Sequence, residues 1–422
     1  MKVSNVISFS VSKIIQKKRF VKDILNSIVS QSGRALLVGG AVRDFFLDYP
    51  VKDLDFEVHG LSLEQLQKLL ERYGVVSLVG KSFGVLRLHG LDVDWSLPRK
   101  DSSGRHPIVE YDPNMSYLQA FARRDLTINA MGIDMESFEL IDLYGGMQDL
   151  EQGVLRATDL DFFVQDPLRL LRVMQFVGRF EMSVDEQLSA LCTGMDMSNV
   201  SQERIEQEFM KLFLQSKHPS QGLQWLVKIG KFNEFLPGVI VCDELWKKLD
   251  EVTVDSYDLD QNKIVMMWAI VASFLDTKQI DKTFEKIGRK EKLPWAHFMK
   301  LVSQHKKTIT QAVNLVVYAQ IVQSELTEVQ IKWLAVWFAP ELTIRMLSKF
   351  IKIRYSQNES DRLLQQAEQI GVADQPEAPL LTGKDFLDVA QGAQIGLLVR
   401  KAYQLQIDQG MVDEFDLKKM VM

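Results

Sequence analysis

Two short segments near the start of the chain combine glycine, arginine and aspartate in a spacing that suits phosphate and metal chemistry. Residues 37–44 read LVGGAVRD and residues 53–55 read DLD. Paired glycines let the backbone approach a bound group closely, and the amides of a following helix N-terminus, together with Arg43, favour phosphate. On a strand, Asp53 and Asp55 share one face, and two such carboxylates suit Mg²⁺, which prefers oxygen ligands completed by substrate phosphates. Each segment alone is more often an ordinary turn or a solvated strand end.

A further acidic segment lies some forty residues downstream. Residues 91–99 read LDVDWSLPR, which predicts a short strand that carries Asp92 and Asp94 on one face. If this strand lies beside the first aspartate pair, either carboxylate could orient an attacking hydroxyl or support a metal. The alternative, an exposed strand face, fits the same pattern.

Residues 123–131 bring two arginines, an acid and an amide together in the sequence RRDLTINAM. Guanidinium groups such as that of Arg124 suit phosphate oxygens, and the side chains of Asp125 and Asn129 suit sugar hydroxyls. A nucleoside triphosphate offers both kinds of group. A surface ion-pair cluster is the alternative interpretation.

Residues 165–176, QDPLRLLRVMQF, place a row of polar side chains on an expected helix. Asp166 is a suitable N-cap and Pro167 a suitable first helical residue, so a capped helix is the plain interpretation. Asp166, Arg169 and Arg172 follow at three-residue steps on one helix face. This polar row could line a cleft.

These segments lie among elements of two kinds. The first 150 residues mix strand and helix patterns, whereas nearly everything after about residue 160 has helical apolar spacing. Short apolar or alternating runs predict strands over 35–38, 54–58, 85–89 and 91–97, and amphipathic spacing predicts a helix over 62–73. We therefore expect a mixed head over residues 1–155, followed by helical segments over 156–220, 221–375 and 376–422.

The composition narrows the classes of protein that fit. Hydrophobic residues make up 46% and charged residues 25% of the 422 residues, a balance typical of soluble globular proteins. No apolar run approaches the ~20 residues of a membrane span. Two cysteines cannot build a disulfide framework or a zinc site, and a net charge of −6 gives no overall footprint for DNA or RNA. We expect a cytoplasmic protein without a membrane or DNA partner, and the sequence does not predict an oligomeric state.

Taken in this order, the glycine-aspartate, Arg-Arg-Asp and Asp-x-x-Arg segments resemble those of the class II tRNA nucleotidyltransferase and bacterial poly(A) polymerase family. Residues 203–211, ERIEQEFMK, resemble the helix-stabilising neck segment of the same family. The resemblance spans residues 35 to about 215. It implies an α+β fold, in which a small mixed-sheet nucleotidyltransferase head is followed by an all-helical neck, body and tail.

The resemblance also assigns roles at the metal and phosphate site. It implies that Asp53 and Asp55 are the Mg²⁺ ligands and that Gly40 and Arg43 contact the triphosphate. Arg124 would contact the nucleotide, and Asp125 and Asn129 would contact its sugar, as proposed above. Asp94, suggested above by its strand pattern and not by the resemblance, would complete the set of catalytic carboxylates with this pair.

Base recognition is implied at the start of the later helix. In that family a Glu-Asp-x-x-Arg segment reads the incoming base, which implies this role for Asp166 and Arg169, with Arg172 near the phosphates. Cytosine and adenine both present an amino donor beside a ring-nitrogen acceptor, so a carboxylate and an arginine suit both bases. Uracil and guanine offer a carbonyl where the carboxylate needs a donor. The chain departs from the family pattern by having Gln165 in place of Glu and Gln175 where many members have Arg.

We therefore expect template-independent CCA addition to the 3′ end of tRNA, with CTP and ATP as substrates and Mg²⁺ as cofactor. Because of Gln165, a partial enzyme that adds only C or only A is an alternative, and a poly(A) polymerase is another. Poly(A) polymerases typically end in a strongly basic tail, whereas residues 380–386, LLTGKDF, resemble the C-terminal segment of tRNA-type enzymes. A catalytically inactive RNA-binding protein would be expected to have lost its carboxylates, and Asp53 and Asp55 are both present.

Overall fold

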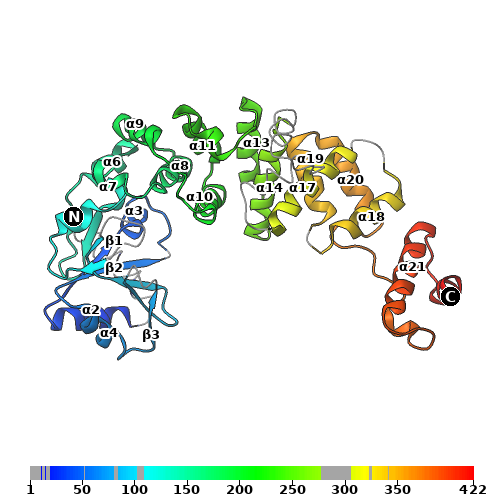
Figure 1. Ribbon diagram of the computed structural model, residues 1–422, viewed down its shortest axis with the longest axis horizontal. Coiled ribbons are helices and arrows are strands. Elements are labelled where there is room, and N and C mark those ends of the chain that lie inside the picture. Colours follow the sequence, from blue (N-terminus) through cyan, green and yellow to red (C-terminus); the bar gives the residue numbers. More distant parts are fainter. Residues whose placement is uncertain are drawn as a thin grey trace. The chain divides into compact units, whose positions relative to one another are not determined.

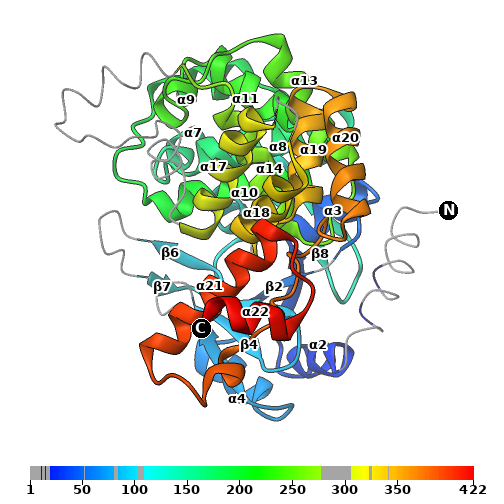
Figure 2. The same ribbon diagram turned by 90° about the vertical axis from the view of Figure 1, so that its right-hand side faces the viewer.

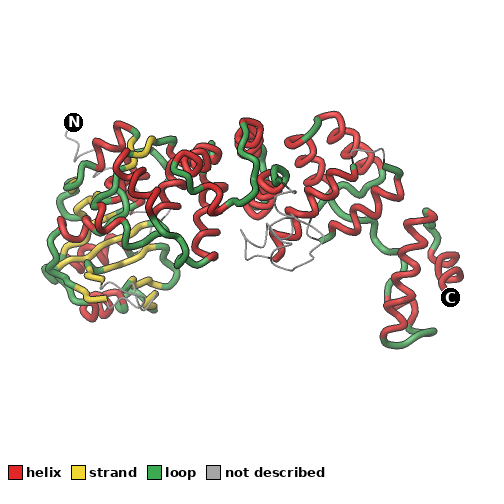
Figure 3. The backbone as a smooth tube through the Cα atoms, turned by 45° about the horizontal axis from the view of Figure 1, so that its top comes forward, coloured by secondary structure: helices red, strands yellow, loops and turns green. Residues whose placement is uncertain are grey.

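The chain divides into two compact units, which are described separately. The computed structural model describes residues 11, 15, 20–51, 53–79, 84–101, 109–276, 306–322, 326–340 and 342–422. Residues 1–201 and 225–230 form the first unit, and residues 202–224 and 231–422 form the second. Within the described ranges, every strand belongs to the first unit and the second unit is helical (Figure 3). The expected α+β class, a mixed-sheet head followed by helices, is confirmed, and the division into neck, body and tail stays a prediction.

A seven-stranded mixed sheet forms the centre of the first unit. Strands β2 and β5 pair in parallel, and all other neighbours in this sheet are antiparallel. Two short pairs lie outside it, β6 (Arg99–Asp101) with β7 (Val109–Tyr111) and β10 (Val154–Leu155) with β11 (Ser183–Val184). The order across the main sheet is β3 (Val76–Val79), β4 (Val85–Leu88), β5 (Val93–Ser96), β2 (Leu54–His59), β1 (Arg34–Val38), β8 (Met131–Asp134) and β9 (Leu140–Asp142).

The alternation of side chains along the central strands separates an apolar face from a polar one. Phe56 of β2 is fully buried and stacks on Trp95 of β5, with ring centroids 4.7 Å apart. Because successive side chains point to opposite faces, the neighbours Asp55 and Glu57 lie on the other face of β2, together with His59. The apolar face anchors the sheet, and the opposite face is left to carry charged groups.

Helices cover the sheet on both sides (Figure 1). Helix α2 (Val21–Ser30) contacts β1 and α4 (Leu63–Leu70), and α4 begins at Ser62 with a capping box, as its amphipathic spacing predicts. Helix α3 (Gly40–Phe46) follows β1 directly and contacts β1, β2 and β8. The described part of this unit also contains α5 (Tyr117–Ala122), the 3₁₀ turn η1 (Thr127–Asn129), α6 (Gly146–Gln152), α7 (Leu160–Phe163), α8 (Arg169–Phe180) and α9 (Glu186–Gly194).

The helix expected to begin at Asp166 begins three residues later, at Arg169. The carbonyl of Asp166 accepts the amide of Arg169 at 3.0 Å and the carbonyl of Pro167 accepts the amide of Leu170 at 3.1 Å, which is the spacing of a tight 3₁₀ turn. The Asp166 carboxylate also accepts the amide of Leu168 at 3.2 Å. The N-cap of α8 is Leu168, so Asp166 caps the tight turn before the helix and not the helix itself.

The second unit consists of helices packed in pairs. Figure 2 shows α19 (Ile344–Arg354) and α20 (Gln357–Gln369) side by side. None of the helices in the described ranges combines the length and the apolar composition needed to span a bilayer. Among the described residues the further helices are α10 (Gln202–Gln215), α11 (Pro219–Lys228, shared with the first unit), α12 (Phe232–Phe235), α13 (Asp243–Val254), α14 (Asp260–Ala272), α17 (Lys306–Ile321), α18 (Glu328–Phe338), η2 (Gly383–Phe386), α21 (Ala393–Gln409) and α22 (Glu414–Val421).

Candidate active site

The acidic residues expected to act together lie on adjacent strands. Asp55 of β2 is the direct register partner of Asp94 on the parallel neighbour β5, and Asp53 immediately precedes β2. On the next strand, Arg87 donates two hydrogen bonds to the Asp94 carboxylate, at 2.6 and 2.7 Å. The prediction that the strand of Asp94 lies beside the first aspartate pair is confirmed.

We call Asp53, Asp55 and Asp94, which lie together at the start of β2 and on β5, the acidic edge. The electrostatics of these three carboxylates suit a cation. Burial raises the pKa of Asp55, and the nearby Asp94 and Asp53 carboxylates raise it further. Negative charge at Asp55 is thus only partly offset by the arginines around it. Among the described residues, no group of three or more His, Cys, Asp or Glu has the geometry of a metal cluster. Asp53 and Asp55 are the residues that would hold Mg²⁺, which one or two carboxylates commonly bind while substrate phosphates and water complete its shell.

The glycine pair forms a sharp turn between β1 and α3. Gly39 has φ of +69°, a conformation that residues with a side chain rarely adopt, and it is the N-cap of α3. A Cβ atom on Gly39 would lie 3.7 Å from Nη1 of Arg124, and one on Gly40 would lie 3.3 Å from Nη2 of Arg43. Two of the arginines predicted to contact the nucleotide, Arg43 and Arg124, therefore flank this turn.

Arg43 faces inward. It is 4% exposed, and its guanidinium lies 5.0 Å from the ring centroid of Phe176 and 4.8 Å from that of Phe180, both on α8. It donates to Asp44 at 2.9 and 2.7 Å and to Asn129, and Asp44 also accepts from Arg179 of α8. Burial lowers the pKa of Arg43, although a guanidinium remains charged in proteins. Arg43 and Asp44 therefore hold α3 against α8, through Phe176 and Phe180 in one case and Arg179 in the other.

Asp125 and Asn129 continue this buried network. One oxygen of Asp125 accepts from the Asn129 amide and from the backbone N–H of Leu126, both at 2.8 Å, and the other accepts from Nε of Arg172 at 2.6 Å. Burial alone would raise the pKa of Asp125, but Arg172 and these hydrogen bonds outweigh it and lower the pKa to about 2. Asp125 and Asn129 are 8% and 5% exposed. Their burial suits the orientation of neighbouring arginines better than direct contact with a sugar.

Main-chain carbonyl groups hold Arg169, one of the two residues expected to read the base. Arg169 donates from Nη1 to the carbonyl of Phe162 at 2.7 Å and from Nη2 to the carbonyl of Arg123 at 2.8 Å. Asp166 and Arg169 are both half-buried, and Gln165 beside them is exposed. The bond to Arg123 links the start of α8 to the residue that precedes Arg124.

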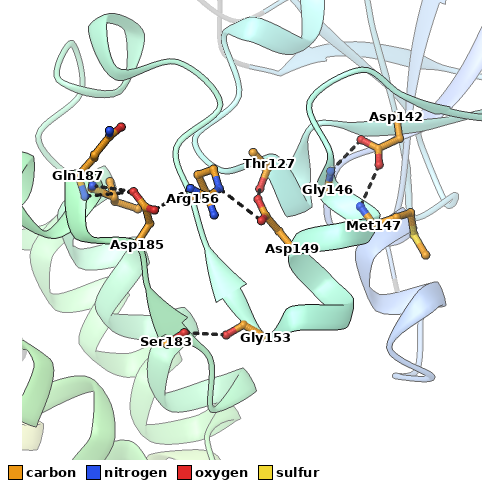
Figure 4. A network of polar contacts seen from close by, with 11 residues as sticks. Thr127, Asp142, Gly146, Met147, Asp149, Gly153, Arg156, Ser183, Asp185 and Gln187 are labelled. Atoms are coloured by element: carbon orange, nitrogen blue, oxygen red, sulfur yellow. Dashed lines mark hydrogen bonds and ion pairs between the residues drawn. The ribbon is translucent and has the colours of Figure 1, made fainter.

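A second polar network supports the turn that carries Asn129 (Figure 4). Thr127 donates to Asp149 at 2.6 Å, and Arg156 bridges Asp149 at 3.4 Å and Asp185 at 2.6 Å. Asp185 caps α9 by accepting two backbone amides. This network ties η1 to α6 and α9.

Several residues of the site were not predicted from the sequence. Glu57 and His59 occupy the alternate positions after Asp53 and Asp55, so period-two spacing alone places them on the same strand face. Glu57 accepts from Arg124 at 3.0 Å and from His59 at 3.1 Å. Arg87 and Arg179 carry no local signal, because their partners come from other elements.

Two segments of the chain match models of known protein families. Residues 35–156 match the model of the poly A polymerase head domain, and residues 185–242 match the probable RNA and SrmB-binding site of polymerase A. The multifunctional CCA proteins of Laribacter hongkongensis and Haemophilus ducreyi are each 35% identical, over 221 and 227 residues. These alignments cover 50% and 51% of this chain and 52% and 53% of the relatives, so the chain spans about half the length of the curated relatives it matches.

Two solved structures share the fold along nearly the whole chain. The Thermotoga maritima CCA-adding enzyme complexed with tRNA has a TM-score of 0.61 at 21% identity and covers 97% of both chains. The Bacillus stearothermophilus CCA-adding enzyme in complex with CTP has a TM-score of 0.70 at 17% identity and covers 95% of both. At these identities the structures establish the fold, while the motifs and family models identify the head. Over the matched residues, 35–156 and 185–242, the chain belongs to the nucleotidyltransferase family of poly(A) polymerases and CCA-adding enzymes.

Proposed function

We propose that the protein adds C and A nucleotides to the 3′ end of tRNA from CTP and ATP, without a template and with release of pyrophosphate. The observation that carries this proposal is the acidic edge formed by Asp53, Asp55 and Asp94 next to the Gly39–Gly40 turn and Arg124. It supplies metal ligands and phosphate-binding groups in one unit. Structural neighbours described as complexes with tRNA, CTP and ATP support the choice of acceptor and substrates.

The proposed reaction is a displacement at phosphorus. The 3′ hydroxyl oxygen of the RNA attacks the α-phosphorus, the bond from that phosphorus to the bridging oxygen breaks, and pyrophosphate leaves. Asp53 and Asp55 would hold Mg²⁺, which when bound neutralises phosphate charge and makes the hydroxyl a better nucleophile. Asp94, which is bonded to Arg87 and lies opposite Asp55, would orient the hydroxyl and support these ligands. No covalent intermediate with the protein is required.

The triphosphate would lie along the glycine turn. The Gly40 backbone and Arg124 are the direct phosphate contacts in this proposal. Arg43 would act from beneath the turn, because its guanidinium is buried and bonded to Asp44 and Asn129. Arg172, which is partly exposed, would approach the phosphates while its Nε is held by Asp125.

Base selection is assigned to Asp166 and Arg169. We expect Asp166→Ala to reduce the preference for CTP over UTP, and for ATP over GTP, by about 1 to 3 kcal/mol, or roughly fivefold to more than a hundredfold. The measurement is kcat/KM for each nucleotide on a tRNA transcript. Asp161→Ala, at an exposed aspartate on α7, is the matched control and should leave both preferences unchanged. Unchanged preferences in Asp166→Ala would remove Asp166 from base reading.

The nucleotides added can be read directly from product length. A tRNA transcript lacking its 3′ CCA is incubated with protein, Mg²⁺ and CTP alone, ATP alone or both, and the products are resolved to single nucleotides. Two additions with CTP and a third only with both nucleotides would support CCA addition. Termination after C, a lone A on a transcript ending in CC, or a long A tail would instead indicate a partial enzyme or a poly(A) polymerase. The exposed Gln165 would then be the first residue to replace, with Gln165→Glu.

A further inference from the structure

We propose that Glu57 and His59 are positioning residues that hold the Arg124 guanidinium at the Gly39–Gly40 turn and thereby set the affinity for the nucleoside triphosphate. This inference deepens the proposed function and rests on it for the identity of the ligand. Glu57 and His59 lie outside the Arg-Arg-Asp and Asp-x-x-Arg segments that carry the family resemblance. Their contacts with Arg124 carry the inference.

The Glu57 carboxylate is fully engaged by two partners. Its Oε2 accepts from Nη2 of Arg124 at 3.0 Å, and its Oε1 accepts from Nε2 of His59 at 3.1 Å. Glu57 and His59 are each 6% exposed, whereas the side chain of Arg124 is 30% exposed. Glu57 is therefore a buried anchor, bonded through both oxygens, beneath a partly exposed arginine.

The other end of Arg124 reaches the glycine turn. Nη1 lies 3.7 Å from the position that a Cβ atom of Gly39 would occupy, so the guanidinium spans the distance between Glu57 and the turn. A carboxylate on one edge of a guanidinium fixes its plane and leaves the remaining N–H groups to donate elsewhere. The remaining donors are those that a phosphate at the turn would need.

His59 joins this anchor to the helix that leads into Arg124. Its ring meets the ring of Tyr117 edge to face, with centroids 4.8 Å apart, and Tyr117 is the first residue of α5. Arg123 is the C-cap of α5 and Arg124 follows it. His59 thus contacts both the side chain that holds Arg124 and the helix that precedes it.

Strand β2 consequently has two separate tasks on one face. Asp53 and Asp55 lie at its start, where they can reach a metal. Glu57 lies one alternate position further along, where its side chain is only 8% exposed, against 29% for that of Asp94, and where its two oxygens bond Arg124 and His59 within the protein. Glu57 is therefore assigned to arginine placement and not to metal binding. Replacing Glu57 should therefore weaken nucleotide binding more than it slows the chemical step.

The test is equilibrium binding of CTP in the presence of Mg²⁺, together with steady-state kinetics on a tRNA transcript lacking CCA. We expect Glu57→Gln to raise both the Kd and the KM for CTP about tenfold, while kcat falls less and the KM for RNA does not change. His59→Gln, which can still donate to Glu57, should lose less affinity than His59→Leu. Glu64→Gln, at an exposed glutamate on α4, is the matched control and should behave as wild type.

A double-mutant cycle separates positioning from a general loss of structure. If Glu57 acts through Arg124, adding Glu57→Gln to Arg124→Ala should weaken CTP binding no further. Equal losses in both backgrounds, or wild-type CTP affinity in Glu57→Gln, would overturn the proposal. If Glu57→Gln does not fold, the same cycle is measured with His59→Gln. A wild-type protein that binds CTP with this coupling but adds no nucleotide to RNA would contradict the proposed function and leave the positioning role intact.

Discussion

Replacing Asp55 by alanine is expected to lower the rate of nucleotide addition about a thousandfold, which corresponds to ~4 kcal/mol of lost transition-state stabilisation. Asp55 lies opposite Asp94 on the neighbouring strand, and with Asp53 it forms the carboxylate pair proposed to hold the metal. Losing one ligand removes stabilisation of the charge that develops on the transferring phosphoryl group. The rate is measured in single-turnover assays at saturating Mg²⁺ and CTP, with Asp161→Ala as the control.

Replacing Asp55 should increase the stability of the folded protein, although it lowers the rate of nucleotide addition. The pKa of Asp55 is raised above its ordinary value of 3.8 by burial, by Asp94 and by Asp53. The folded protein therefore binds the Asp55 proton more tightly than the unfolded chain, and this contribution to stability is lost as the pH rises through the raised pKa. Asp55→Asn should raise the Tm at pH 7 in the absence of metal while it abolishes activity. A near-normal rate in either variant, or a lower Tm in Asp55→Asn, would show that the carboxylates have been assigned wrongly.

Replacing Asp125 by asparagine is expected to lower the free energy of unfolding by about 2 to 3 kcal/mol at pH 7, since each unit of pKa shift corresponds to ~1.4 kcal/mol. Asp125 is buried, and its pKa is lowered to about 2 because Arg172, Asn129 and the Leu126 amide outweigh the effect of burial. A carboxyl with a lowered folded pKa stabilises the protein above its ordinary value of 3.8, and this stabilisation is lost as the pH falls towards 2. The difference between wild type and Asp125→Asn should therefore shrink over that range.

Urea unfolding at several pH values measures this difference. The double variant with Arg172→Gln shows whether the stabilisation passes through the ion pair, because Asp125→Asn should then cost less in that background. The Kd for CTP should also rise in Asp125→Asn, since Asn129 and Arg172 lose a shared partner. Equal destabilisation at pH 7 and pH 2.5 would mean that the ion pair does not account for the stability of this network.

The sequence predicts the elements that rest on local patterns. Four strands of the main sheet and α4 were expected from alternation and amphipathic spacing, and their central residues agree with the structure. The sequence suggests that β5 lies beside β2 but does not establish the pairing, because strand pairing depends on contacts between distant segments. Strands β8 and β9 were not predicted. In the structure β8 pairs with β1, and β9 pairs with β8 and forms one edge of the sheet.

The candidate site shows the same division. The residue types expected for phosphate chemistry all lie in the first unit, and Asp55 and Asp94 are register partners. What local pattern did not predict is the depth of Arg43, which depends on Phe176 and Phe180 more than a hundred residues downstream. Long-range partners decide which polar residues of a motif face a ligand and which orient their neighbours.

Protein side chains, and not a template strand, are proposed to select the nucleotide, and competition among the four nucleoside triphosphates tests this most directly. kcat/KM is measured for each nucleotide on two tRNA transcripts, one lacking CCA and one ending in CC. We predict that CTP exceeds UTP on the first and that ATP exceeds GTP on the second, each by about tenfold to a hundredfold. Equal use of UTP and CTP on the first transcript, or of GTP and ATP on the second, would contradict selection by Asp166 and Arg169.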